Sequence, residues 1–212
     1  MSPNVPSSVK NPEKVRTRRA QIIDAAVALF SQKGFHKTTT REIARASGLS
    51  NGAVYEYVQS KEDILYLVCK RIHKSVEEQL RLSLSEHALG AVRLRHAIKS
   101  FLHVMDAMKD DILLIYQESK SLPSAFLKEV LHDEENITRV FEQLLMDGIE
   151  DGSLRTAREG IPLLAHNIVV CGQMWAFRRW ALHDVTFEQF SEMQIRMLMQ
   201  ACGADPQVIH GE

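Results

Sequence analysis

The feature that most constrains this chain is a pair of short helical segments separated by a single glycine near its N-terminus. Thr39 and Glu42 have the spacing of a capping box, in which the threonine hydroxyl accepts an early helical amide and the glutamate reaches back. Gly48 ends this first segment, and Ser50 can cap the second one. A longer amphipathic segment at about 12–32 comes before both. Two short helices joined by a glycine turn, behind a supporting helix, predict a helix-turn-helix.

The remainder of the chain has helical periodicity, and no stretch alternates with the two-residue period of a strand. The predicted helices lie at about 12–32, 40–47, 51–58, 61–84, 90–108, 111–119, 124–150, 160–182 and 187–202. The fold class is therefore predicted to be all-α. We expect a helix-turn-helix DNA-binding domain over 13–61 and a larger helical regulatory and dimerisation domain over 62–212.

Residues 1–12 are polar, contain three prolines and lack the apolar core of a signal peptide. They are predicted to be a disordered arm of a cytoplasmic protein. No uninterrupted apolar run approaches the roughly 18–20 residues of a membrane span, so no membrane partner is expected. Three widely spaced cysteines, with no CxxC pair, favour reduced thiols over disulfides or a zinc site.

The charges are divided unevenly along the chain, although the net charge is only −1. Residues 1–61 carry ten Lys and Arg against four Asp and Glu, whereas the remainder carries 16 against 23. A basic N-terminal part on an acidic body is the electrostatic pattern expected when a single domain binds DNA.

The run GFHKTTTREIARASGLSNGAVYEYVQSKE, residues 34–62, closely resembles the DNA-binding signature of the TetR (tetracycline-repressor) family. Asn51, Gly52 and Ala53 open the predicted recognition helix: an asparagine amide suits adenine, and the two small residues let the backbone approach the groove. Arg41 can pair with guanine or with a phosphate. By their match to the family, phosphate contacts are expected from a further set of residues: Thr39, Thr40, Ser50, Tyr55, Tyr57 and Lys61.

Other roles for these residues stay open at this point. Thr39 and Ser50 can act as helix caps alone, and Tyr55 can be partly in the core. An arginine cluster in the first helix is either a solvated face or an arm that contacts the minor groove: Arg16, Arg18 and Arg19. The small core of the module is expected to contain Phe35, Ile43, Ala44, Leu49 and Val54.

A single helix-turn-helix reads few base pairs, so specific binding predicts a homodimer on a near-palindromic site of double-stranded DNA. The last two predicted helices, at 160–182 and 187–202, are apolar over more of their surface than burial on one side requires. The TetR resemblance implies that they pair with their copies in a four-helix bundle.

The larger domain is expected to bind a small-molecule effector. The candidate ligand-binding residues are Phe101, Met105, Tyr116, Gln117, Met174, Trp175, Arg178 and Arg179. Either arginine can bind an anionic group, and Glu118 is a candidate ion-pair partner for one of them. This half resembles TetR regulators of fatty-acid and acyl-coenzyme A metabolism, which implies that the arginines contact ligand phosphate. The alternative is that they form interface or surface ion pairs.

The sequence therefore predicts a transcriptional repressor whose effector, an acyl-CoA or another amphipathic or apolar molecule, shifts the helix at 61–84 and releases DNA. A TetR-like regulator with a different effector, or with none, is the alternative. A helical enzyme is a further alternative, but no nucleophile–base pair or phosphate-binding glycine loop supports it, so no enzyme activity is expected. We expect no cofactor and no metal.

Overall fold

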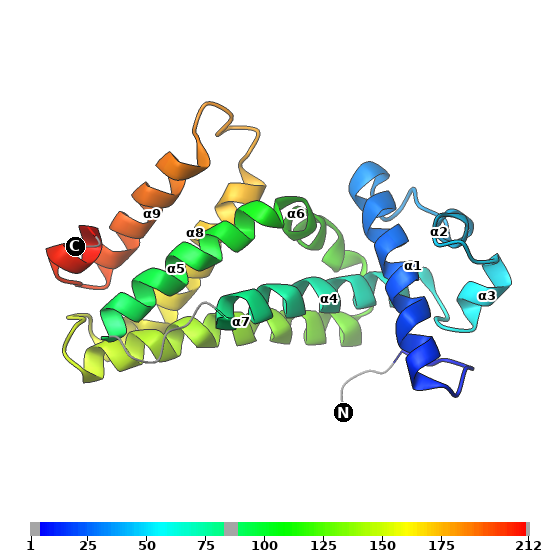
Figure 1. Cartoon of the computed structure of the whole chain (residues 1–212), viewed down its shortest axis with the longest axis horizontal. Helices are drawn as coiled ribbons and strands as arrows, with labels where there is room; N and C mark the ends of the chain where they lie inside the picture. Colours follow the sequence, from blue (N-terminus) through cyan, green and yellow to red (C-terminus); the bar gives the residue numbers. More distant parts are fainter. Residues whose placement is uncertain (1–4, 83–88, 211–212) are drawn as a thin grey trace. The chain divides into compact units, whose positions relative to one another are not determined.

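The computed structural model describes residues 5–82 and 89–210, which form helices and loops without a strand (Figure 1). The elements are α1 (Pro12–Lys33), α2 (Thr40–Ala46), α3 (Asn51–Tyr55), α4 (Lys61–Leu82), α5 (Gly90–Ala107), α6 (Lys109–Glu118), η1 (Ser119–Ser121), α7 (Ser124–Glu150), η2 (Arg158–Gly160), α8 (Ile161–Phe177), α9 (Phe187–Ala201) and α10 (Pro206–His210). The predicted all-α fold is confirmed.

Two helix ends differ from the prediction, and one short helix was missed. The third helix ends at Tyr55 rather than near residue 58, and α8 ends at Phe177 rather than at 182. The short C-terminal helix α10 was not predicted. After α3 the apolar pattern continues into a turn that buries Tyr57 and Val58, so periodicity gave no signal for the end of that helix.

The chain divides into two compact units. The first, which we name the head unit, combines the residues up to 73 with the segment 113–133. The second, the body unit, combines 74–112 with the residues from 134 onward. The units therefore do not divide at the predicted 61/62 boundary. The chain passes from one unit to the other within α4, α6 and α7, and a part of the expected regulatory domain belongs to the head unit.

In the head unit, α1, α2 and α3 pack around a small apolar core. Ile22, Phe35, Ile43 and Val54 are at most 2% exposed, and the Phe30 and Phe35 rings meet edge to face. Four of the five predicted core residues are buried, and the fifth, Leu49, is half-buried. The sequence pattern therefore located this core correctly, and the core fixes the angle between the helices.

The prediction of a disordered arm at 1–12 is wrong for residues 5–12; residues 1–4 lie outside the described part. Val5 is buried, and both Ser7 Oγ and Ser8 N donate hydrogen bonds to the carbonyl oxygen of Glu56. Asn11 caps α1 by accepting the amides of residues 13 and 14, and Pro12 begins the helix. The polar composition of this segment gave no sign that Val5 would be buried or that Asn11 would cap α1.

In the body unit, α5 packs against α8 and α9, and α10 contacts α5 and α9. The Phe101 and Phe141 rings meet edge to face at 5.3 Å. A Cβ at Gly172 would lie 2.4 Å from the Phe101 ring, so α8 can approach α5 this closely only with a glycine there. Of the described residues, the stretch Arg158–Phe177 is the one whose length and hydropathy would suit a membrane span, and 39% of it is buried.

Candidate nucleic-acid interface

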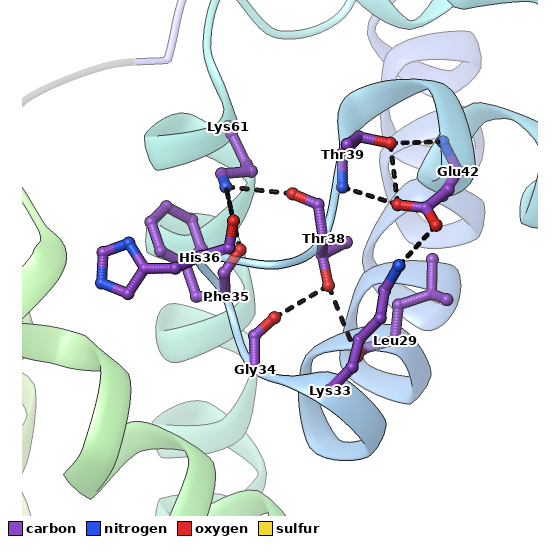
Figure 2. A network of polar contacts seen from close by, with 9 residues as sticks. All are labelled: Leu29, Lys33, Gly34, Phe35, His36, Thr38, Thr39, Glu42 and Lys61. Carbon is purple, nitrogen blue, oxygen red and sulfur yellow. Dashed lines mark hydrogen bonds and ion pairs between the residues drawn. The ribbon is translucent and has the colours of Figure 1, made fainter.

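The start of α2 is fixed by the predicted capping box (Figure 2). Thr39 Oγ1 accepts a hydrogen bond from the amide of Glu42 at 3.3 Å, and Glu42 Oε2 accepts one from the amide of Thr39 at 2.9 Å. Lys33 Nζ donates to the other carboxylate oxygen of Glu42. Hydrogen bonds from Lys33 and Thr39 lower the pKa of Glu42 to about 2. The end of α1 and the beginning of α2 are thus joined through one ionised carboxylate.

The predicted base-reading positions lie on the first turns of α2 and α3. Ser50 Oγ accepts the amide of Ala53 at 3.1 Å and so caps α3. Asn51 and Gly52 are exposed, and Ala53 is half-buried. Arg41 is exposed, and its side chain makes no hydrogen bond or ion pair with any part of the chain that the structure describes. These groups are therefore free to meet a ligand on the outer surface of the module.

Of the residues expected at phosphates, Thr40 and Tyr55 lie together at the surface. The Thr40 hydroxyl and the Tyr55 hydroxyl are 3.2 Å apart, which joins α2 to α3, and Tyr55 is 47% exposed. Tyr55 is thus not a core residue. Tyr57 is only 2% exposed, so the structure gives its side chain a packing role. Its phosphate contact stays a prediction.

Lys61 makes contacts that the sequence did not reveal. Its Nζ donates to the carbonyl oxygens of Phe35 at 2.9 Å, Thr38 at 3.0 Å and His36 at 3.4 Å, and lies 4.3 Å from the Phe35 ring centroid (Figure 2). An ammonium has three hydrogens to donate, and three carbonyl acceptors surround this one. Lys61 therefore braces the α1–α2 loop, and its predicted phosphate contact stays untested beside that role.

The three arginines of α1 have different surroundings. Arg19 donates to the carbonyl oxygens of Tyr57 and Val5, and burial lowers the pKa of its guanidinium. Arg16 is exposed and pairs with Glu13, and Arg18 is half-buried and pairs with Gln21. Arg19 is thus a structural residue that ties the N-terminal segment to the end of the recognition module.

Comparison with known proteins supports the same reading of this surface. Residues 22–66 match the family described as bacterial regulatory proteins, tetR family, and residues 90–167 match a tetracyclin repressor-like C-terminal domain. The transcriptional regulator HbdR of Aromatoleum sp. (strain CIB) is 33% identical over 85% of this chain and 78% of its own length. This chain belongs to the TetR family. It is a helix-turn-helix transcriptional regulator, as its sequence predicted.

More distant TetR-family proteins extend the comparison. The fatty acid metabolism regulator protein of Bacillus subtilis (strain 168) is 22% identical, over 82% of this chain and 88% of its own length. The structure of AibR in complex with isovaleryl coenzyme A and operator DNA superposes with a TM-score of 0.72 at 18% identity, covering 89% of this chain and all of that one. At this identity the structural likeness shows that the fold is shared.

The predicted ligand-binding residues are divided between the two units. Tyr116 and Gln117 are exposed on the part of α6 that belongs to the head unit, whereas the other six residues belong to the body unit. Phe101 and Met105 are each 1% exposed and pack in the core of the body unit. The structure therefore shows a packing role for these two, and ligand contact for the whole set stays a prediction.

The tryptophan and arginine side chains at the end of α8 contact one another in two pairs. Trp175 Nε1 donates to Asp106 Oδ1 at 2.7 Å, and the Arg179 guanidinium lies 4.3 Å from the Trp175 ring centroid. Arg178 lies over the Trp180 ring, which is 73% exposed. The candidate partner of these arginines, Glu118, accepts a backbone amide in the head unit through one carboxylate oxygen, and its pairing with either arginine stays a prediction.

A groove of about 520 Å³ lies elsewhere in the body unit, between α5, α9 and the C-terminal residues. Its walls carry charges of both signs: Arg95 and Lys99 come from α5, whereas Glu188, Glu192 and Arg196 come from α9. None of the eight predicted ligand-binding residues lines this groove. Sequence reasoning missed it, because its charged residues lie on two helix faces that look like ordinary solvated surface.

The capping carboxylate predicts a specific pH response. Because the pKa of Glu42 is about 2 in the folded chain, against an ordinary value of 4.5, its ionised form stabilises the fold. That stabilisation is fully present above pH 4.5 and is lost as the pH falls through about 2. NMR titration of the Glu42 side-chain carbonyl carbon should give a midpoint near 2, and Lys33→Met should raise it. A wild-type midpoint near 4.5 would contradict the prediction.

Proposed function

We propose that this TetR-family regulator binds a near-palindromic operator as a homodimer and represses transcription until a small-molecule effector releases it in the cytoplasm. The main support is the exposed surface that Arg41, Asn51 and Gly52 present at the starts of two capped helices. Polar groups that remain unpaired on a rigid module are suited to base edges, because binding then breaks no existing contact.

The proposed division of roles follows from what each group is free to do. Asn51 reads adenine through its amide, and Arg41 reads guanine through two parallel N–H donors. Gly52 and Ala53 leave room for the groove wall and a thymine methyl group. Thr40 and Tyr55, whose hydroxyls already meet at the surface, contact the phosphates that position the module. Thr39, Ser50, Tyr57 and Lys61 complete the predicted phosphate set.

Loss of the Arg41 side chain should relax recognition at one base pair. A duplex that the wild type selects from a random library serves as the probe, and Arg41→Ala should lower its affinity by about 5–150-fold, the cost of one bidentate contact. For duplexes altered at the base pair that Arg41 contacts, Arg41→Ala should lower the affinity much less. Arg139→Ala, which removes the same charge from the body unit, is the control. Equal weakening for all duplexes would show that Arg41 contacts phosphate instead.

The proposed dimer interface is the apolar outer surface of α8 and α9. Leu163 and Val170 on α8 are 68% and 56% exposed, and Met193 and Met197 on α9 are 59% and 47% exposed. The two helices pack against each other, and we propose that these side chains form one surface over both. A second copy that covers this surface accounts for an apolar helix that its own chain buries only in part.

A charge on this surface should separate the subunits. Val170→Glu should convert a dimer into a 24.1 kDa monomer, because pairing two copies would bury two unpaired carboxylates. Sedimentation velocity measures the outcome. Leu131→Glu places the same charge on an exposed apolar residue of α7 and should leave the dimer intact. An unchanged dimer in Val170→Glu would place the interface elsewhere.

The proposed effector is an acyl-CoA thioester. AibR, which shares the fold, binds isovaleryl coenzyme A and operator DNA together in its structure. In this chain, Arg178 follows the end of α8, and its guanidinium contacts only a Trp180 ring in the described structure, so it remains available for a phosphate. Arg179, Trp175 and Met174, which lie in the same unit, complete the proposed site. The alternative is a different effector, or none.

Operator affinity measured with and without isovaleryl coenzyme A tests the effector. Complete release requires the ligand to prefer the non-binding state by about 5.5 kcal/mol, which is a roughly 10⁴-fold difference in affinity. Isovalerate and free coenzyme A, tested separately, should each release much less DNA. Arg178→Ala should weaken release and leave basal operator affinity unchanged, with Arg158→Ala as its control. If no thioester of any chain length changes operator affinity, the acyl-CoA proposal is wrong.

A further inference from the structure

The α1–α2 loop is the segment on which the placement of α2 depends, and its polar backbone is held from two sides. Lys61 binds three of its carbonyl oxygens, as described above. The amide N–H of Phe35 has a different partner, the Oε1 atom of Glu118 at 3.1 Å. Phe35 is 2% exposed, so water does not readily replace either contact. One buried residue therefore has its N–H bound by an anion and its C=O bound by a cation.

The backbone next to Phe35 has the shape that this contact needs. Gly34 has φ of +81°, which a residue with a side chain rarely adopts, and its N–H closes α1 on the carbonyl oxygen of Phe30. A Cβ at Gly34 would lie 3.2 Å from Glu118 Oε1. Thus the carboxylate lies close against the glycine, and a Cβ there would require it to shift by a few tenths of an ångström.

A second contact joins the α1–α2 loop to the segment that contains Glu118. His36 Nε2 and Ser121 Oγ are 3.2 Å apart, and Ser121 lies three residues after Glu118. Glu118 and Ser121 both come from the segment 113–133, which belongs to the head unit. Two successive loop residues are therefore bound by a segment that is far away in the sequence, at the junction of α6 and α7.

We propose that Glu118 is a positioning residue for operator binding, which holds the α1–α2 loop in the conformation that presents α2 and α3 to DNA. Without its carboxylate, the buried Phe35 N–H has no acceptor, and the loop must move to find one. Since Thr39 and Arg41 follow Phe35 within six residues, a shift of the loop displaces the cap and the predicted guanine reader. The proposal rests on the proposed DNA-binding function for its second measurement only.

The first measurement needs no DNA. In hydrogen exchange followed by NMR, Glu118→Ala should speed exchange of the Phe35 amide by about tenfold or more, because a hydrogen bond to a charged group is lost. Glu118→Gln keeps an oxygen acceptor at the same reach and should restore most of the protection. Glu159→Ala, which removes an exposed carboxylate without a hydrogen bond in the described structure, is the matched control and should match the wild type.

The second measurement is affinity for the duplex that the wild type selects from a random library. Glu118→Ala should weaken binding by about tenfold or more while the slope of affinity against salt stays the same, because no phosphate contact is removed. Glu118→Gln should bind within about threefold of the wild type, since the acceptor is retained. If Glu118→Ala does not fold, Glu118→Asp withdraws the carboxylate by one methylene and should show the same losses.

Each outcome decides between the two proposals. Unchanged exchange at Phe35 in Glu118→Ala would overturn the role of Glu118, and so would equal loss of affinity in the Ala and Gln variants. Faster exchange with unchanged operator affinity would show that the loop contact is real but does not position the DNA-binding helices, which also overturns it. If the wild type selects no duplex, the proposed function fails, and exchange alone then decides whether Glu118 holds the loop.

Discussion

A buried peptide group must find partners inside the protein, and this requirement organises the DNA-binding end of the chain. The α1–α2 loop is short, it turns sharply at Gly34, and it places Phe35 in the core. A loop of this kind satisfies only part of its own backbone, here through the N–H and hydroxyl of Thr38, which donate to the carbonyl oxygens of Phe35 and Gly34. The Phe35 N–H is bound by Glu118, and Lys61 adds a charged donor to the Phe35 carbonyl oxygen. The proposed positioning of α2, and of the recognition helix that follows it, depends on this arrangement.

The local features of the head unit were predictable because they depend on neighbours in the sequence. Thr39 and Glu42 are three residues apart, and Ser50 precedes the amide that it caps by three residues. The roles of Lys61, Arg19 and Glu118 depend on groups 14 to 83 residues away. A basic residue near a DNA-binding motif looks the same in sequence whether it contacts a phosphate or a carbonyl oxygen. Only the fold separates the two roles.

The body unit was predicted less well, for a different reason. Helix positions follow from periodicity, so most of its helices were located within a few residues. A ligand site, in contrast, is made by side chains from several helices, and apolar residues such as Phe101 and Met105 fit a pocket and a core equally well. The structure shows that these two pack in the core. It also shows a charged groove between α5 and α9 that no single segment indicated.

The composition of the head unit has a consequence for building chimeric regulators. A DNA-binding domain is an attractive cassette to transfer from one regulator to another, with the cut placed where the helix-turn-helix ends in the sequence. In this chain such a cut would leave behind residues 113–133, and with them the acceptor of the Phe35 amide and the hydroxyl that meets His36. With the role proposed for Glu118, the transferred domain needs a host whose own α6 ends with an equivalent acceptor. Compatibility between the two halves then depends on that side chain as well as on the linking helix.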